Sequence, residues 1–571
     1  MKKLVLYVSF CLSLAGLSFA QNLSALLPAD AMLVMGVEDL ASHAEKLEPF
    51  IEEFNRLELG AALTAAFASE EDTDTGADLD SRFTELTALD VIGQEAWIVV
   101  SASRFNPLPA LTLMTSLSDT AQASVAEVFE DELAKADAEA LTEGDYSFYQ
   151  ILVDDPDLPV QVLAVAQEGS LLMLSTNPDT LRGVLRQLGG SNDPAFASSQ
   201  GFQQTLAQLG GGNFYGYLDF SQIVSAISPY ASGFGFDELV TRLSQAFDTA
   251  GVSAGVGRVT ADGFESESLQ AVNADGGDAS LYALLTDATA VDMSVSALAP
   301  EGALSFSSSA TNLSAWWDYL NEVSASTPEL GGDLDTLLLT FLGLDLRSTL
   351  FNWTGDQVTT ITTGLGEVAE PGIASTNLLG ETVYIIESTD ASASEAGLGE
   401  LFDTASSVIA SFADPSGGMG SADKMTDTIA ETEVYSYNIT DGVALSYAQK
   451  GDSAYIATSA DAMSKTLIVS GNPLTGDMQA LLAQVPEGVS SFSIADNRAS
   501  LAGTAQQVGA QLEMMAGLGG ASNLNFEAVE AASDKLEQFL AFVAEKLGYS
   551  VGYSQRSPES IYGYGTTAVS W

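Results

Sequence analysis

The sequence predicts an α+β protein made of two tandem related units, each with a mostly antiparallel sheet and inserted amphipathic helices. Three observations predict this fold class. The composition, 46% hydrophobic and 17% charged over 571 residues, is that of a folded chain with enough apolar material for a core. Short segments with period-two alternation come in consecutive groups, and amphipathic helical segments lie between the groups. The order of these segments then repeats along the chain.

Each unit is predicted to open with a strand, an Asp or Asn, and a helix. The first opening, residues 27–31, leads into an apolar stretch that ends at Asp39, and the second, residues 299–303, leads to Asn312. The short side-chain oxygen at each position can accept hydrogen bonds from the free amides of a first helical turn, so we expect both residues to cap helices. The helices are predicted at residues 41–54 and 314–323.

The middle of each unit repeats the same order. A strand that contains Trp97 in the first unit corresponds to one that follows Trp353 in the second, and an amphipathic helix is predicted further along each unit, at residues 120–134 and 396–412. Three strands and a helix come next, and here Leu172 to Leu181 parallels Ala454 to Met463. The strands are predicted at residues 146–152, 160–167 and 170–175, and at 434–439, 443–449 and 453–458.

Both units are predicted to finish in the same way. A second strand, Asx and helix opening covers residues 214–219 in the first unit and 489–497 in the second. A helix and a final hairpin follow. The helices are predicted at residues 236–250 and 526–547, and the hairpins extend to Val272 and Val569. We expect the two units to share one fold.

The N-terminus is typical of a secretory signal peptide. Lys2 and Lys3 precede an apolar segment at residues 4–17, and Ser18 and Ala20 form a small-x-small cleavage site. We therefore expect export to the periplasm, the cell envelope or the extracellular space, with a mature chain that begins at Gln21. The predicted organisation is a signal peptide at residues 1–20, a first α+β repeat at 21–297 and a second at 298–571.

The single cysteine, Cys11, lies inside the apolar segment rather than at its end, which disfavours a lipid anchor. Cleavage would leave no cysteine. Disulfides, thiolate zinc sites, iron–sulfur clusters and cysteine nucleophiles are thereby excluded from the mature chain. No segment after the signal peptide has 18 uninterrupted apolar residues, so we expect no transmembrane helix after signal cleavage.

The charge balance excludes further classes of protein. The chain has 77 acidic and 19 basic residues and a formal net charge of −58. Such a surface repels phosphate backbones and anionic headgroups, so we expect no nucleic-acid partner. The acidic excess is typical either of adaptation to high salt or of an ordinary acidic exported protein.

A proline-led opening followed by a strand, an Asx and a helix is found at Pro28, with shorter echoes at Pro300 and Pro486. In an exported chain this pattern resembles domain of unknown function family 3352, a group of bacterial envelope proteins. The resemblance covers most of the mature chain. It implies an extracytoplasmic α+β protein and carries over no catalytic residue.

Two Gly-x-Ser-x-Gly patterns, around Ser253 and Ser550, match the nucleophile elbow of hydrolases. An elbow lies between a strand and a helix and needs a histidine base, whereas both patterns here follow a helix and lead into a strand. The single histidine, His43, lies in a predicted helix, and the corresponding position in the second unit is close to Trp316, which favours a packing or surface position. We interpret both serines as strand residues.

Three other patterns receive a structural interpretation. Ser421 and Lys424 form a Ser-x-x-Lys motif in a Gly- and Ser-rich loop, without the partner motifs of penicillin-recognising enzymes. The acidic stretch 70–80 resembles a calcium loop but has its glycine one position early and no acidic twelfth residue. Residues 562–571 alternate and are predicted to be the last strand. Tryptophans Trp316, Trp317 and Trp353 could line a binding surface, although their apolar surroundings favour the core.

These observations favour a non-enzymatic exported protein, a binding or structural module for an unknown envelope protein or ligand, and leave enzymatic activity undecided. The alternative is a carboxylate-dependent extracytoplasmic hydrolase acting on glycans, which needs two facing acids, one with a raised pKa. The acids that align between the units lie beside turns or helix starts, where capping explains them. They are Asp90 with Asp345, Asp179 with Asp461, and Glu95 with Asp356. We assign no catalytic, cofactor-binding or metal-binding residue and expect no cofactor.

Overall fold

The structure is a computed structural model in which the chain forms two compact units. The first unit comprises residues 1–277, 511–542 and 571, and the second comprises residues 278–510 and 543–570. The residues that the structure describes are 23–39, 41–59, 62, 95–102, 109–119, 121–123, 125–126, 133, 138–152, 162–191, 194–233, 236–327, 331–364, 380–413, 424–440, 443–469, 476–501 and 526–571.

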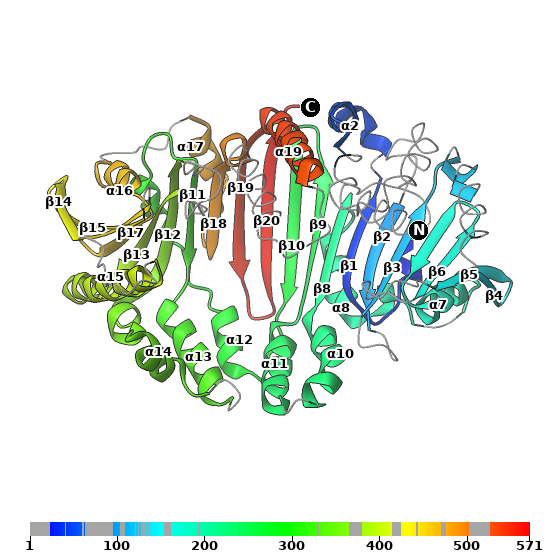
Figure 1. Ribbon diagram of the computed structural model, residues 1–571, viewed down its shortest axis with the longest axis horizontal. Coiled ribbons are helices and arrows are strands. Elements are labelled where there is room, and N and C mark those ends of the chain that lie inside the picture. The colour runs from blue at the N-terminus through cyan, green and yellow to red at the C-terminus, as the bar shows by residue number, and fades with distance from the viewer. Residues whose placement is uncertain are drawn as a thin grey trace. The chain divides into compact units, whose positions relative to one another are not determined.

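The described part of the first unit contains a sheet of ten strands, all paired antiparallel in the order β4-β5-β6-β7-β3-β2-β1-β8-β9-β10 (Figure 1). The strands are β1 (Ala31–Glu38), β2 (Glu95–Ser101), β3 (Ala110–Ser116), β4 (Glu139–Glu143), β5 (Tyr146–Leu152), β6 (Val162–Glu168), β7 (Leu171–Ser175), β8 (Phe214–Asp219), β9 (Val252–Val259) and β10 (Gly263–Ala271).

The described part of the second unit also contains ten antiparallel strands, in the order β14-β15-β16-β17-β13-β12-β11-β18-β19-β20. Strand by strand, this is the order found in the first unit. The strands are β11 (Ser305–Ala310), β12 (Thr354–Gly364), β13 (Glu381–Ser388), β14 (Lys424–Ile429), β15 (Thr432–Thr440), β16 (Val443–Lys450), β17 (Ser453–Ala457), β18 (Ser491–Asp496), β19 (Leu547–Arg556) and β20 (Ser560–Val569). The predicted α+β class with antiparallel sheets is confirmed.

Helices connect the strands and flank the sheets (Figure 1). The first unit contains α2 (Ala44–Arg56), α7 (Pro178–Leu188), α8 (Gln200–Gln204), α9 (Leu206–Leu209), α10 (Phe220–Gly233), α11 (Asp237–Ala250) and most of α19 (Phe526–Lys546). The second contains α12 (Ala279–Leu285), α13 (Leu313–Ala325), α14 (Leu334–Leu342), a π-helix (Arg347–Phe351), α15 (Ala391–Ala413), α16 (Ala460–Leu467) and α17 (Gly476–Leu482). No helix in the described ranges has an apolar stretch long enough to cross a membrane.

Helix α19 joins the first unit through aromatic contacts with α2. The ring centroids of Phe50 and Phe542 lie 5.8 Å apart, and those of Phe54 and Phe539 lie 5.7 Å apart. Trp571, the last residue, also packs in the first unit, 5.2 Å from the ring of Phe264. Edge-to-face contacts of this kind stabilise beyond the area that they bury. A C-terminal segment therefore completes the N-terminal unit.

The predicted caps differ in outcome. Asn312 caps α13 as expected, because its side-chain oxygen accepts from the amide of Ala315 at 2.7 Å. The expected cap at Asp39 is wrong: a 3-10 turn, Ala41–His43, comes first, and the residue before α2 is His43, which makes no side-chain capping bond. Asp39 instead has a φ of +58°, and its Oδ1 is buried without a partner.

The core of each sheet follows the predicted period-two pattern. In the second unit Phe306, Ile361 and Ile494 come from three adjacent strands and are fully or almost fully buried. In the first unit Val165 and Leu174 pair across β6 and β7 within a separate core cluster. Alternate side chains on a strand point to one face, so the same spacing that predicted these strands also builds their cores.

Gly251 provides a test of the junction between α11 and β9. Its φ of +66° and ψ of −151° lie in a region open essentially only to glycine, and a Cβ there would lie 2.0 Å from the carbonyl oxygen of Ala271. We expect Gly251→Ala to lower the free energy of unfolding by more than about 3 kcal/mol, since backbone strain costs about 1–3 kcal/mol before the clash is added. Urea denaturation of the purified variant measures this loss.

Gly210→Ala is the matched control. Gly210 has a similar backbone, with φ +77° and ψ −168°, but a Cβ there meets no atom within 4 Å. The Gly210→Ala variant should therefore lose only the part of the free energy of unfolding that backbone strain accounts for, about 1–3 kcal/mol. Equal losses for the two variants would contradict the predicted clash with Ala271.

Candidate functional site

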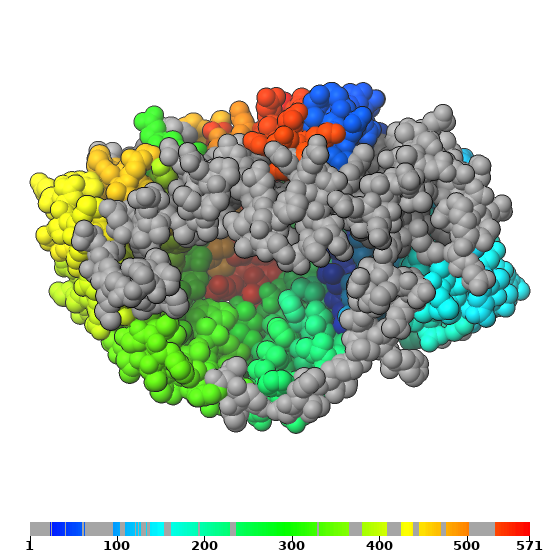
Figure 2. Space-filling view, in the orientation of Figure 1, coloured from blue at the N-terminus to red at the C-terminus, as the bar shows by residue number. Residues whose placement is uncertain are grey.

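A pocket of about 440 Å³ opens on the second unit between α15 and the strands β14, β15 and β16. Its lining combines three carboxylates from the helix with two tyrosines and one lysine from the strands. These residues are Glu395, Glu400, Asp403, Tyr435, Tyr447 and Lys424. Strand β14 is the outermost strand in this sheet, and the yellow atoms of this part of the chain lie at the surface on the left of Figure 2.

The helix supplies its carboxylates through its periodicity. Glu395, Gly399 and Asp403 are spaced by four residues, which places them along one face of α15, and Glu400 lies on the adjacent row. Gly399 keeps this face open, because a Cβ there would lie 3.1 Å from the hydroxyl of Tyr447. The helix therefore lines one side of the pocket with acidic side chains and approaches Tyr447 closely at Gly399.

The strands supply the aromatic residues through their register. Tyr435 pairs with Tyr447 across β15 and β16, and Tyr437 pairs with Lys424 across β15 and β14. Because Tyr435 and Tyr437 are two residues apart on one strand, all four side chains share one face of the sheet. The ring of Tyr447 stacks 4.9 Å from Tyr435 and 6.4 Å from Tyr437. Three rings thus form a row beneath the pocket.

The ammonium group of Lys424 lies over this row. Its Nζ is 5.0 Å from the ring centroid of Tyr435, 5.5 Å from Tyr437 and 5.8 Å from Tyr447. A cation within about 6 Å of an aromatic face is attracted by the ring quadrupole. The same Nζ lies 3.6 Å from Asp403 Oδ1. Aromatic faces and a carboxylate therefore contact one ammonium.

The tyrosine hydroxyls donate to the surrounding acids. Tyr437 donates to Asp403, and the single hydroxyl proton of Tyr435 is shared between Glu433 at 3.0 Å and Glu395 at 3.4 Å. Burial, with the neighbouring carboxylates, raises the pKa of Tyr435 to about 12. Burial likewise raises the pKa of Tyr437, helped by the hydrogen bond to Asp403, and that of Tyr447. The phenols stay neutral at physiological pH, so they are hydrogen-bond donors and aromatic faces rather than bases.

The sequence reasoning missed this pocket. The predicted strands 434–439 and 443–449 contain its tyrosines, but only the pairing register brings Tyr435 beside Tyr447. Lys424 was assigned to a Ser-x-x-Lys motif whose Ser421 lies outside the described residues. In the structure, Lys424 is the first residue of a strand. The alternation of tyrosines in the segment around Tyr435 was the available signal.

A second carboxylate cluster lies in the first unit. Glu38 and Glu95 are directly opposite each other on β1 and β2. Glu95 is only 2% exposed, and its Oε1 accepts from the indole of Trp97 and the amide of Leu23, both at 2.8 Å. Tyr215 donates to Glu38 at 2.9 Å. Glu95 is buried as the first residue of β2, and the segment before it, where a turn was expected, lies outside the described residues.

Burial raises the pKa of Glu95 to about 7, and the two hydrogen bonds partly oppose this rise. Burial also raises the pKa of Glu38. A facing pair with raised pKa values is what the glycan-hydrolase alternative requires. However, Glu95 is enclosed by Trp97 and Leu23. No substrate has access to a side chain buried in this way, so the pair fits a structural role.

Asp179, Asp461 and Asp345 lie at helix starts, as expected, whereas Asp356 lies within β12, close to the turn that precedes this strand. Asp179 and Asp461 occupy the first turns of α7 and α16 and pair with Arg182 at 2.7 Å and Lys465 at 2.5 Å. Asp345 accepts from the amide of Ser348 at the start of the π-helix. Asp356 accepts from Asn312 at 2.8 Å. Asp90 and the acidic stretch 70–80 lie outside the described residues.

The serines of both Gly-x-Ser-x-Gly patterns lie in strands, as predicted. Ser253 lies in β9, opposite Leu218 and Gln270. Ser550 lies in β19 and donates to Asn497 Oδ1 at 3.2 Å. His43, the single histidine, ends a 3-10 turn in the first unit. In both cases a helix precedes the strand, so neither pattern forms a nucleophile elbow.

The predicted tryptophans divide between core and surface. Trp353 is fully buried and donates to the carbonyl of Thr349 at 2.9 Å. Trp317 is 9% exposed and stacks on Phe351 at 4.7 Å. The core interpretation is confirmed for these two, whereas Trp316 is half-buried.

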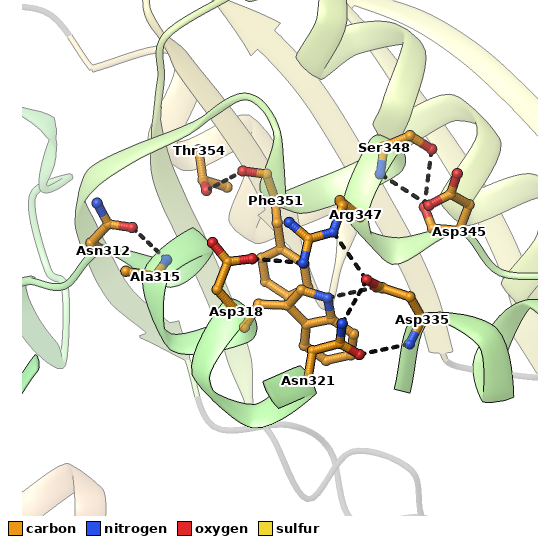
Figure 3. Close-up of polar contacts among 11 residues, drawn as sticks. Asn312, Ala315, Asp318, Asn321, Asp335, Asp345, Arg347, Ser348, Phe351 and Thr354 are labelled. Carbon is orange, nitrogen blue, oxygen red and sulfur yellow. Dashed lines mark hydrogen bonds and ion pairs between the residues drawn. The ribbon is translucent and has the colours of Figure 1, made fainter. Parts of the chain in front are cut away.

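Asp335, Asn321 and Arg347 form a polar network at the junction of α13, α14 and the π-helix (Figure 3), and Trp317 belongs to it through its indole. Asp335 accepts from the indole of Trp317 at 2.8 Å, from Asn321 at 3.1 Å and from Arg347 at 3.0 Å. The other side of the Arg347 guanidinium pairs with Asp318 at 2.6 Å. These partners satisfy both oxygens of Asp335 and stabilise the junction, so the network fastens helices rather than presenting a site.

A further pocket of about 570 Å³ in the first unit borders the proline-led opening, with Pro28 and Asp30 on one side and the start of α7 on the other. Its charged groups are paired. Asp179 contacts Arg182 at 2.7 Å, and Arg186 contacts Glu143 at 3.4 Å. No group of three or more His, Cys, Asp or Glu side chains that could hold a metal ion is found among the described residues.

Residues 113–477 match the family described as Protein of unknown function (DUF3352), and the chain belongs to this family. The predicted resemblance is therefore confirmed. No curated protein matches the chain. Among solved structures, crystal form III of TP0453 is similar with a TM-score of 0.24 and 10% sequence identity, over 47% of this chain and 86% of that chain. That similarity is too weak to carry an argument.

The burial of Glu95 predicts a pH-dependent stability. The folded chain holds the Glu95 proton up to a pH of about 7, whereas the ordinary value is 4.5. The contribution of Glu95 to the free energy of unfolding is therefore fully present below about pH 4.5 and is lost as the pH rises through about 7. Glu95→Gln keeps an acceptor for Leu23 and Trp97 without a charge. We expect it to raise the free energy of unfolding at pH 8 by up to about 3 kcal/mol, and by almost nothing at pH 4.5.

Chemical denaturation at both pH values measures this effect. Glu139→Gln, on an exposed residue of β4, is the control and should change stability little at either pH. A Glu95→Gln gain of the same size at pH 4.5 and pH 8 would show that the buried carboxyl group does not titrate in this range.

Proposed function

We propose that this chain is an exported, non-enzymatic binding protein built from two related units, and that the pocket on the second unit takes up a positively charged group of its ligand or partner. Its place is the periplasm, the cell envelope or the extracellular space. The observation that carries the binding role is the pocket itself, where the carboxylate of Asp403 and the aromatic faces contact the ammonium of Lys424, with two further carboxylates in the lining.

The sequence supports the proposed export. Residues 1–20, which lie outside the described part of the structure, combine two lysines, an apolar segment and a small residue at Ala20. The strong net negative charge is consistent with a cationic partner, because opposite charges steer association.

The shared strand order supports a common origin of the two units. Each unit places its first strand between its second and eighth strands, and each ends with a hairpin of the ninth and tenth. Ten strands in one order are unlikely to recur by chance in neighbouring segments, and the parallel between Leu172–Leu181 and Ala454–Met463 lies within it. After a duplication the two units can diverge, so a pocket on the second unit does not require an equivalent pocket on the first.

The chemistry of the pocket supports binding over catalysis. Its phenols are neutral at physiological pH, because burial raises the pKa of Tyr435 to about 12 and raises those of Tyr437 and Tyr447. Glu395 and Asp403 accept hydrogen bonds from these phenols, and Asp403 also pairs with Lys424. General acid–base catalysis needs a group that titrates near the working pH. The pocket offers a stable acceptor for a cation instead.

The export proposal predicts a mature N-terminus at Gln21. Signal peptidases require small residues at the cleavage site. The protein purified from its own host's exported fraction should therefore have the intact mass of a chain that begins at Gln21. Ala20→Leu should slow processing, and the uncleaved precursor should accumulate. A protein that retains residues 1–20 in that fraction would contradict the proposal.

The binding proposal predicts affinity for a cationic peptide. We expect the mature chain to bind trilysine in isothermal titration calorimetry at 0.15 M NaCl. The triple variant Glu395→Gln, Glu400→Gln, Asp403→Asn should weaken binding by at least about tenfold, since each exposed charge contact contributes up to ~1 kcal/mol. N-acetylated trilysine with blocked side chains should not bind.

A matched triple variant separates the pocket from the general acidity of the surface. Asp427→Asn, Asp452→Asn and Glu559→Gln remove the same charge from exposed positions of the second unit outside the pocket. If this variant loses as much affinity as the pocket variant, trilysine binds only through the overall charge and the pocket is not its site.

A further inference from the structure

We propose that the pocket on the second unit is an aromatic cage for a single organic ammonium group, and that Lys424 is an internal occupant which an external ammonium displaces. This inference rests on the proposed function, in that it takes the pocket to be the ligand site, and it names the chemistry that the site recognises.

The row of rings is built to receive a diffuse cation. Tyr435, Tyr437 and Tyr447 present their faces to Lys424 Nζ at 5.0, 5.5 and 5.8 Å. The rings of Tyr437 and Tyr447 are almost fully buried beneath it, with Phe402 from α15 packed 5.0 Å from Tyr447. Because Phe402 packs against both Tyr437 and Tyr447, these two rings cannot turn away when the occupant leaves. The cage is therefore preorganised, which lowers the entropy cost of binding.

The hydroxyls of the cage are already engaged. Tyr437 donates to Asp403, and the hydroxyl proton of Tyr435 is shared between Glu433 and Glu395. These bonds leave the ring faces, rather than the hydroxyl protons, for a ligand. They also hold the carboxylates of Asp403 and Glu395 beside the rings, where each adds Coulomb attraction for a cation. A ligand with positive charge spread over carbon and nitrogen uses both features.

The geometry favours an organic ammonium over a metal ion. A metal ion needs several converging oxygen or nitrogen ligands. Within the described ranges no three His, Cys, Asp or Glu side chains come together for that purpose. Ring faces attract lysine and methylated ammonium groups, for which aromatic cages are a known mode of recognition.

Lys424 is placed to leave the cage. It begins β14, the outermost described strand of its sheet, and its side chain is 36% exposed. Its carboxylate partner, Asp403, is 60% exposed at 3.6 Å, which is a long and solvated ion pair. Such pairs contribute little to stability. A long lysine side chain also regains rotamer freedom when released, so displacement carries a small cost.

The experiment removes the internal occupant. Lys424→Met keeps the apolar stem but has no charge, and we expect it to bind tetramethylammonium at least tenfold more tightly than the full mature chain does. A tethered competitor acts at a high effective concentration, and its removal frees the cage. Chemical shifts of ¹³C-labelled tyrosine rings, followed during a tetramethylammonium titration, measure the affinity at the site itself.

Lys465→Met is the matched control. Lys465 lies on α16 of the same unit and pairs with Asp461 at 2.5 Å and Glu381 at 3.1 Å, away from the cage rings. Its replacement changes the net charge equally and should leave the affinity for tetramethylammonium unchanged. If Lys424→Met and Lys465→Met bind the probe equally, Lys424 does not occupy a cage and the inference is overturned.

A second pair of variants tests the ring faces in the Lys424→Met background. Tyr435→Phe keeps the face and should retain tetramethylammonium binding, whereas Tyr435→Leu should lose most of it. Tyr435 is only half-buried, and thermal unfolding checks that both variants fold. Equal binding by the two would show that charge alone attracts the probe, which would also overturn the cage.

Two probes distinguish the sources of an ammonium group and separate this inference from the proposed function. If Lys424→Met binds only tetramethylammonium more tightly than the unmodified chain does, the cage takes small methylated amines. If the variant also binds trilysine more tightly, the cage takes peptide lysines as well. If the variant binds neither probe more tightly, the cage inference is overturned. Carboxylate-dependent trilysine binding by the unmodified chain would still support the proposed function. If the unmodified chain binds no trilysine but Lys424→Met binds tetramethylammonium, the cage is supported and the proposed function fails.

Discussion

The position of the first strand of each unit governs the rest of the sheet. β1 is hydrogen-bonded to β2 along one edge and to β8 along the other, and β11 is bonded in the same way to β12 and β18. A strand in this position has its backbone donors and acceptors satisfied on both sides. The strands that follow must therefore extend outward in two directions. Within its own unit, each first strand has one arm that extends to β4 or β14 and another that extends to β10 or β20.

The end of an arm has different physical properties from the middle. The central strand β13 is largely buried, whereas β14 is exposed along almost its whole length. On β15 and β16, the next two strands inward, Tyr437 and Tyr447 are buried and Tyr435 is half-buried. Large aromatic rings, exposed acids and a basic residue at the edge meet there because the sheet changes from interior to surface within three strands. The pocket is a consequence of this gradient.

The sequence was informative where burial follows a simple period. Strands such as β5 and β8 have the predicted bounds, because alternation there coincides with one buried face. Strand β14 escaped prediction because its sequence, Lys-Met-Thr-Asp-Thr-Ile, places Asp427 between Met425 and Ile429 on the same face and leaves almost every side chain exposed. Asp39 was expected to cap a helix, but the cap depended on a backbone turn that no sequence pattern specified. The pocket needed the strand register, and register is set by partners distant in the chain.

The contact between α2 and α19 joins residues near the two ends of the chain, since Phe50 meets Phe542. Contacts of such long sequence separation form late, because the intervening chain must be ordered or looped first. During most of its synthesis, the N-terminal unit is therefore without the helix that covers Phe50 and Phe54. A chain that leaves the cytoplasm N-terminus first would carry this uncovered aromatic surface across the membrane, which would favour an unfolded passage and call for protection from aggregation until the last helix arrives.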